Sequence, residues 1–208
     1  MQFTPLDLAA YPRREHFQHY LNEVPCSYSM TVQLEITPLL HTGYKLYPTL
    51  IHCISRAVNG NDAFKLGLDS AGRPGLYDAV FPNYTIFHQA TKTFSSLWTE
   101  YHEEFSQFHR AYSRDLSQYG DDPAFSPKPP IPNQFYLSAI PWVNFQSFQL
   151  TISGPPTLAP IFTLGRYSES GGRTFLPLAL QVHHAACDGY HAAQFVTALQ
   201  ELILNFSA

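Results

Sequence analysis

An alternating segment, residues 27–36, limits the possible folds more than any other part of the chain. One of its faces carries Tyr28, Met30, Val32, Leu34 and Ile36, and the other carries Ser29, Thr31, Gln33 and Glu35. A period of two residues, apolar on one side and polar on the other, is typical of a strand with one buried face. The segment therefore predicts a half-buried strand in a sheet that has other elements packed on one side.

Further helices and strands are predicted in an irregular order along the chain. Helical spacing occurs in residues 13–21, 47–59, 97–119 and 190–206, and strand patterns occur in residues 83–88, 161–167, 174–184 and, twice, within 135–152. Residues 65–68 and 75–77 flank a turn and predict a hairpin. Because strands and helices do not alternate regularly, we expect an α+β domain with one mixed or antiparallel sheet and helices packed on it.

The clearest helical pattern lies in residues 97–119. Its apolar residues recur every three or four positions: Leu97, Tyr101, Phe105, Phe108, Tyr112, Leu116 and Tyr119. Such a stripe is typical of a helix face that packs in a hydrophobic core. Burial alone explains it, without a ligand.

Length, charge and cysteine content exclude several classes of protein. The 208 residues suit one domain spanning the whole chain, residues 1–208. A net charge of −4 with no basic patch argues against nucleic acid as a partner. The sequence has neither an apolar run of 18 residues nor a signal-peptide pattern, so we expect no membrane span. Cys26, Cys53 and Cys187 lie far apart and form no disulfide or zinc pattern, which favours reduced thiols in the cytoplasm.

The segment QVHHAACDGYH, residues 181–191, is the strongest candidate for chemistry. Strand alternation places His184 in one row with the apolar Leu180 and Val182, and His183 on the opposite face. Burial disfavours the imidazolium form, so we expect a neutral His184 that can accept a proton from a hydroxyl or thiol. Asp188 precedes the last predicted helix, where it can cap the helix or pair with a cation.

Three interpretations of this segment remain open from the residues alone. The first is a pair of structural histidines beside a helix cap. The second is a metal site, for which His183, His184, Asp188 and His191 would be the candidate ligands, although the spacing matches no common metal signature. The third is acyl transfer with His184 as general base, a role that typically contributes about 10²- to 10⁴-fold in rate.

The same segment resembles the catalytic signature of the type A chloramphenicol acetyltransferases. Other blocks resemble that family in the same order: residues 13–17 (RREHF), 84–88 (YTIFH), 93–98 (TFSSLW), 141–148 (PWVNFQSF) and 159–163 (APIFT). The HHxxxDG motif by itself is shared with dihydrolipoyl acyltransferase cores and peptide-synthetase condensation domains. The set of blocks, which covers essentially the whole chain, is specific to the family.

The resemblance implies a two-layer α/β sandwich with a mixed sheet and a direct transfer reaction. The acetyl group would pass from acetyl-CoA, a co-substrate rather than a permanently bound cofactor, to the primary (3-) hydroxyl of chloramphenicol. His184 would be the general base, Ser147 would stabilise the oxyanion, and Thr163 would help bind the substrate and an ordered water. Asp188 and Arg13 would form a structural ion pair that fixes the catalytic turn. No metal is implied, and Cys187 is not expected to act as a nucleophile.

The resemblance also implies binding residues and an assembly. Substrate contacts would come from Tyr20, Cys26, Tyr28, Phe94 and Phe125, each of which is also an ordinary core candidate, and Tyr167 and Arg166 would lie along the CoA channel. The family is a cytoplasmic homotrimer with active sites between subunits. Two loops, residues 129–132 and 151–158, depart from the family pattern and put the pocket shape in question. The alternatives are an acetyltransferase of this fold for another alcohol and a non-catalytic trimer that binds CoA or another ligand.

Overall fold

The computed structural model describes residues 2–152, 154 and 157–207. The strands are β1 (Phe3–Pro5), β2 (Ser27–Glu35), β3 (Leu66–Leu68), β4 (Pro74–Tyr77), β5 (Phe81–His88), β6 (Thr93–Trp98), β7 (Gln134–Ala139), β8 (Ile161–Leu164), β9 (Ser168–Ser170) and β10 (Arg173–His183). The helices are α1 (Arg14–Gln18), continued by a π-helical turn (His19–Glu23), α2 (Leu46–Asn59), α3 (Phe105–Tyr119) and α4 (Gly189–Leu204), and short 3₁₀ turns span Thr37–His41 and Asp62–Phe64.

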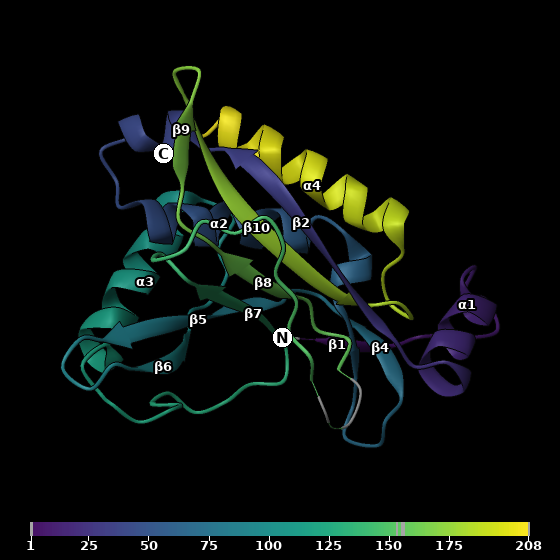
Figure 1. Ribbon diagram of the computed structural model, residues 1–208. Coiled ribbons are helices and arrows are strands. Elements are labelled where there is room, and N and C mark those ends of the chain that lie inside the picture. Colours follow the sequence, from purple (N-terminus) through teal and green to yellow (C-terminus); the bar gives the residue numbers. More distant parts are fainter. Residues whose placement is uncertain (1, 153, 155–156, 208) are drawn as a thin grey trace.

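A seven-stranded mixed sheet forms the centre of the molecule (Figure 1). Its strand order is β2-β10-β8-β7-β5-β6, with β9 paired to β10. The neighbours β5, β7 and β8 run parallel, and the other pairs are antiparallel. β1, β4 and β3 form a second, three-stranded antiparallel sheet that contains the predicted hairpin. The predicted α+β class with a mixed sheet is therefore confirmed.

Helices α2, α3 and α4 cover one face of the large sheet (Figure 1). The even-numbered residues of β2 face them, as the alternation predicts, and Leu34 is only 1% exposed. The neighbouring strands bury Leu178, Phe162 and Tyr84 in the same core. The opposite face carries no helix in the described part of the chain, and the connection between β7 and β8 crosses it (Figure 1). This open face is consequently available for ligands or another subunit.

The predicted helix 97–119 is wrong over its first turns. Leu97 lies in β6, where it pairs with Tyr84 of β5, and α3 begins only at Phe105. Leu97 fits both a helical stripe and a strand, and pairing with β5 decides between them because tertiary context overrides local periodicity. From Phe105 onward the stripe packs in the core, with Phe108 and Tyr112 buried as predicted.

The second of the two strand patterns in residues 135–152 is also wrong. The first forms β7, but the segment after Ala139 is irregular. Its backbone N–H groups bond to side chains of the sheet below: that of Phe148 donates to Thr31 Oγ1 (3.3 Å) and that of Leu150 to Gln181 Oε1 (3.1 Å). The segment therefore lies across the strands instead of pairing with one. None of the helices in the described residues combines the length and apolar character needed to cross a membrane.

Candidate active site

His184 occupies the tight turn that joins β10 to α4. Its backbone N–H donates to the carbonyl of Cys26 (2.9 Å), which ties the turn to the start of β2. The imidazole stacks on the ring of Tyr20, with centroids 3.8 Å apart and planes 3° from parallel, and Tyr28 contacts it edge-on at 5.4 Å. Nδ1 is buried and has no partner among the described residues. The packing therefore fixes the ring and leaves Nε2 as the nitrogen that a ligand can meet.

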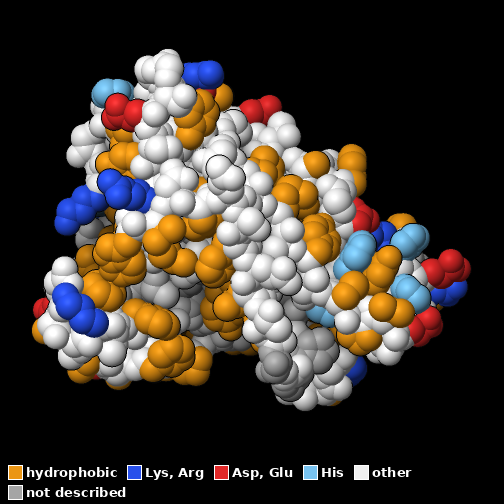
Figure 2. Space-filling model, viewed as in Figure 1, with side chains coloured by type: hydrophobic (Ala, Val, Ile, Leu, Met, Phe, Trp, Pro, Cys, Tyr) orange, Lys and Arg blue, Asp and Glu red, His pale blue; other side chains and the backbone are white. Residues whose placement is uncertain are grey.

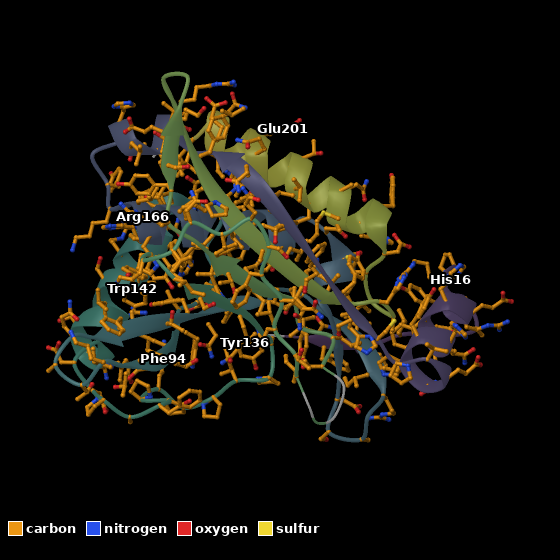
Figure 3. All side chains as sticks on the ribbon, viewed as in Figure 1. His16, Phe94, Tyr136, Trp142, Arg166 and Glu201 are labelled. Atoms are coloured by element: carbon orange, nitrogen blue, oxygen red, sulfur yellow. The ribbon has the colours of Figure 1, made fainter. Side chains whose placement is uncertain are left out.

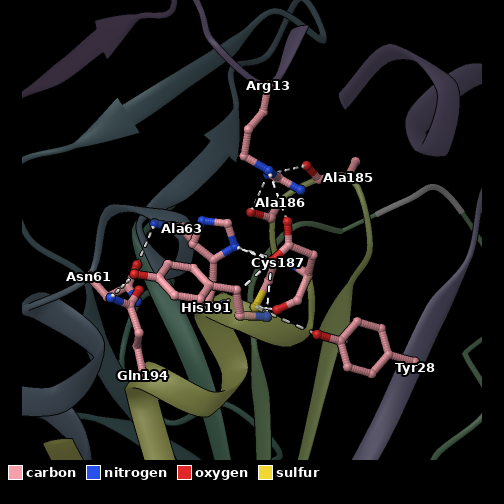
Figure 4. A network of polar contacts seen from close by, with 11 residues as sticks. Arg13, Tyr28, Asn61, Ala63, Ala185, Ala186, Cys187, His191 and Gln194 are labelled. Carbon is pink, nitrogen blue, oxygen red and sulfur yellow. Dashed lines mark hydrogen bonds and ion pairs between the residues drawn. The ribbon is translucent and has the colours of Figure 1, made fainter. Parts of the chain in front are cut away.

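Arg13 holds the backbone of this turn in place. Its Nη1 donates to the carbonyl oxygens of Ala185 (3.1 Å) and Ala186 (2.9 Å), and its Nε lies 3.3 Å from Asp188 Oδ2 (Figure 4). The predicted ion pair between Arg13 and Asp188 is thus present in the structure. An arginine suits this place because its planar group presents several donors in a fixed geometry.

Asp188 serves as the cap of α4 as well as the partner of Arg13. Its Oδ1 accepts from the backbone N–H groups of Tyr190 (3.1 Å) and His191 (3.5 Å), and His191 Nδ1 lies 2.8 Å from the same oxygen. Partial burial opposes ionisation of the carboxyl group and by itself would raise its pKa. The charges of His191 and Arg13, together with the hydrogen bonds from His191, outweigh this effect and lower the pKa of Asp188. The carboxylate stays charged at neutral pH and orients the turn from both sides.

Cys187 lies in the same turn as His184 but has the character of a core residue. It is 1% exposed, and its Sγ lies 3.9 Å from the hydroxyl of Tyr28. Burial raises the pKa of the Cys187 thiol to about 12, so almost no thiolate exists at neutral pH. Because the thiolate is the nucleophilic form, this cysteine is a poor candidate for covalent catalysis, in agreement with the expectation from the sequence.

Thr163 and Ser147 lie on the open face of the sheet, away from this turn. Thr163 in β8 is 3% exposed, and its hydroxyl is 3.0 Å from that of Ser138 in β7. Ser147 is exposed on the segment that crosses the sheet. Both lie near Ala179 of β10. Thr163 of β8 and Thr31 of β2 are the two cross-strand partners of Ala179. Ser147 lies close to Thr31 because the next residue, Phe148, bonds to it.

Phe94 and Phe125 form part of an aromatic cavity on the same open face. Their rings contact each other with centroids 5.9 Å apart. The cavity has a volume of about 800 Å³, and its aromatic lining consists of Phe87, Phe94, Trp98, Phe125, Tyr136 and Trp142. Figure 2 shows hydrophobic side chains gathered over the region of β5 and β6, and Figure 3 shows Phe94, Tyr136 and Trp142 on this side of the molecule. Pro130, from the loop that departs from the family pattern, also lines the cavity.

Arg166 and Tyr167 border a separate apolar cavity of about 500 Å³. Both side chains are exposed at its rim, just after β8. Tyr47 and Leu50 of α2 contribute to the interior, and Trp142 lines both this cavity and the aromatic cavity. Thr85, Phe87 and Ala139 also line both, so the two cavities are neighbours.

The expected site residues fall into two groups that one chain does not bring together. The histidine half-site consists of Arg13, Tyr20, Cys26, Tyr28, His184 and Asp188, and the hydroxyl half-site consists of Phe94, Phe125, Ser147 and Thr163. Strands β10 and β6 are four steps apart in the sheet, and the register places His184 and Phe94 at opposite corners. At about 4.8 Å per strand and 3.3 Å per residue, the two lie roughly 30 Å apart. A small molecule cannot touch both in one chain.

Sequence reasoning missed two contributors to these half-sites. His191 was considered only as a metal ligand, yet it is the second partner of Asp188; its position three residues after the cap is the signal that could have revealed it. Tyr136 lines the aromatic cavity from the polar side of an alternating strand. Across the described ranges, no three His, Cys, Asp or Glu side chains form a group able to hold a metal ion. Part of the atypical loop 151–158, namely residues 153, 155 and 156, lies outside the described residues.

Comparisons with known proteins identify the family of this chain. A solved chloramphenicol acetyltransferase structure superposes with a TM-score of 0.82 at 21% identity, covering 97% of this chain and 100% of that one. The family model for chloramphenicol acetyltransferase matches residues 1–200. A chloramphenicol acetyltransferase from Campylobacter coli is 43% identical, over 98% of this chain and 99% of its own length. One from Clostridium perfringens is 46% identical, over 99% of this chain and 97% of its own length. The chain belongs to the chloramphenicol acetyltransferase family.

Proposed function

We propose that this chain transfers the acetyl group of acetyl-CoA to the primary (3-) hydroxyl of chloramphenicol and so inactivates the antibiotic. The observation that carries the proposal is the fixed imidazole of His184, which stacks on Tyr20 and buries Nδ1, so that Nε2 is the nitrogen left to meet a substrate. Membership of the chloramphenicol acetyltransferase family supplies the substrate class.

The reaction needs one base and one hydrogen-bond donor. His184 Nε2 takes the proton of the acceptor hydroxyl while that oxygen attacks the thioester carbonyl of acetyl-CoA. The hydroxyl of Ser147 donates to the oxyanion of the tetrahedral intermediate, a contribution typically worth about 10²- to 10³-fold. Collapse of the intermediate breaks the carbon–sulfur bond, and the imidazolium of His184 returns the proton to the departing CoA sulfur. Thr163 holds substrate and an ordered water nearby.

The two substrates would bind on different sides of the reacting atoms. Tyr20, Cys26 and Tyr28 would contact the acceptor beside His184, and Phe94 and Phe125 would contact it from the aromatic cavity, as expected for an apolar site with few polar groups. Arg166 and Tyr167 would meet acetyl-CoA at the rim of the smaller cavity, where the guanidinium suits a CoA phosphate.

The separation of the two half-sites supports a homotrimer with active sites between subunits. In such an assembly the histidine half-site of one chain completes the hydroxyl half-site of its neighbour. The exposed tyrosines and tryptophan of the open face are residue types enriched at subunit interfaces. We further propose that residues 1–208 form one domain and that the protein is cytoplasmic, where acetyl-CoA is supplied and thiols such as Cys26, Cys53 and Cys187 stay reduced.

Release of free CoA thiol from acetyl-CoA, with and without chloramphenicol, tests the proposal. We expect chloramphenicol-dependent release by the wild type and a loss of several orders of magnitude in His184→Ala. The matched control is His16→Ala, because His16 is an exposed histidine of α1 (Figure 3). Release that persists in His184→Ala would contradict the assigned base. A folded wild type with no release would indicate another acceptor alcohol, or a binding role if ligands still raise its melting temperature.

A further inference from the structure

A line of polar side chains crosses the floor of the aromatic cavity. Ser96 of β6 donates its hydroxyl proton to Asn83 Oδ1, and Asn83 Nδ2 of β5 donates to Gln134 Oε1 of β7 (2.8 Å). All three residues line the cavity whose walls are aromatic. The first hydrogen bond fixes the orientation of the Asn83 carboxamide, and the second fixes that of Gln134. The NH2 group of Gln134 is therefore the end of the line.

That end is the side-chain amide nitrogen of Gln134, which meets no acceptor among the described residues. Gln134 is 7% exposed, and its Nε2 is buried and has no hydrogen-bond partner among the described residues. Leaving a buried donor unsatisfied is unfavourable, and such groups in native proteins call for an explanation. Gln134 also borders a small cavity of about 160 Å³ beneath Thr157 and Leu158. A donor held this rigidly at a cavity wall is arranged to meet a ligand.

The position of Gln134 indicates which part of a ligand it meets. Along β7, Gln134, Tyr136 and Ser138 share the open face, and Ser138 bonds to Thr163 at the proposed transfer site. Four residues of strand separate Gln134 from Ser138, which amounts to about 13 Å. Gln134 therefore lies at the end of the cavity remote from the transferred acetyl group.

The described lining of the cavity contains no acidic side chain that could accept from Gln134. Of its two lysines, Lys92 follows the far end of β5 and bonds to Gln89 (2.6 Å), away from Gln134, which pairs with the start of that strand. Lys128 Nζ pairs with Asp115 (3.0 Å) and lies 3.5 Å from the centre of the Trp98 ring, so its charge is already compensated within the protein. The NH2 group of Gln134 is an uncharged donor, and a nitro or carbonyl oxygen can accept from it.

We propose that Gln134 is a specificity-determining residue that donates a hydrogen bond to an acceptor oxygen on the aromatic ring of the acetyl-accepting alcohol, at the end away from the reacting hydroxyl. In chloramphenicol that group is the para-nitro substituent. The inference rests on the proposed function, and it adds a polar subsite to a cavity that is otherwise apolar.

The test compares chloramphenicol with its analogue that lacks the nitro group, in wild type, Gln134→Leu and Gln134→Glu. The wild type should prefer chloramphenicol by about 3- to 10-fold in kcat/KM, the range that one net hydrogen bond supplies. Gln134→Leu should remove this preference, mainly by raising KM for chloramphenicol, and leave KM for acetyl-CoA unchanged. Gln134→Glu should reverse it, because a carboxylate repels nitro oxygens.

The control is Gln118→Leu, the same substitution at an exposed site of α3, which should keep the wild-type preference. Equal losses for both acceptors in Gln134→Leu would show a purely structural role and overturn the proposal. An unchanged preference would do so as well, since a bound water would then suffice for Nε2. Wild-type turnover of neither acceptor would refute the proposed function instead, which separates the two failures.

Discussion

The turn that carries His184 should depend on Arg13 for its stability more than on any neighbouring charged residue. Arg13 donates to the carbonyls of Ala185 and Ala186 and pairs with Asp188, and its side chain is only 17% exposed. Hydrogen bonds from a charged donor contribute about 1.5–3 kcal/mol each. We take the lower end for the two bonds to the turn and add about 0.5 kcal/mol for the ion pair, which solvent screens because Asp188 is 34% exposed. Burial of the unpartnered Nη2 offsets part of this sum, so Arg13→Met should destabilise the fold by about 2–3 kcal/mol.

Urea unfolding at one fixed protein concentration measures this loss, because stability of an assembly depends on concentration. Asp188→Asn separates the two roles of Asp188, since asparagine caps a helix as well as aspartate does. It should cost about 1 kcal/mol, the part due to charge. The charge contribution is complete above pH 4 and is lost as the pH falls through the lowered pKa of Asp188.

The matched control for Arg13→Met is Arg14→Met. Arg14 is exposed on the same helix and its side chain makes no hydrogen bond or ion pair with the described residues. It should change stability by less than about 0.5 kcal/mol. If Arg13→Met unfolds at the same urea concentration as Arg14→Met, with an equal slope, the hydrogen bonds to the turn contribute nothing and the reasoning fails.

Two further predictions concern buried polar groups elsewhere. Lys128→Met leaves the buried Asp115 carboxylate with Thr99 as its remaining donor and should lower the free energy of unfolding in urea by about 2–4 kcal/mol. Adding Asp115→Asn should restore part of that loss, and no restoration would contradict the pairing. Burial lowers the pKa of His52, so the unfolded chain takes up a proton below pH 6.5 that the folded one refuses, and stability falls as the pH drops. His52→Asn should flatten this fall in melting temperatures between pH 8 and pH 5, and an unchanged pH dependence would exclude His52 as its source.

Local patterns in the sequence predict most of the elements that build the site. The strand at residues 27–36, the helix at 47–59 and the order of β10, turn and α4 all follow from periodicity and from the capping residue Asp188. These elements are predictable because one buried face or one terminal side chain determines each of them. The family resemblance adds Arg13 as the partner of Asp188, and the geometry agrees.

Features that depend on contacts far apart in sequence were not predictable. Leu97 pairs in a strand because β5 lies beside it, and the segment around Phe148 crosses the sheet because Thr31 and Gln181 offer side-chain acceptors. The free amide of Gln134 is visible only when Asn83 and Ser96 are placed beside it. Periodicity reports which residues are buried, but it carries no information on which strands become neighbours.

The placement of His184 and Thr163 in separate half-sites has a genetic consequence. In the proposed homotrimer, a chain without the imidazole and a chain without the hydroxyl would each be inactive when pure, yet each would carry the part that the other lacks. Mixed assemblies of the two would contain some interfaces at which an intact His184 faces an intact Thr163 from another chain. Co-expression of two inactive alleles would then restore part of the activity, so defects in this protein are expected to complement one another between half-sites and not within them.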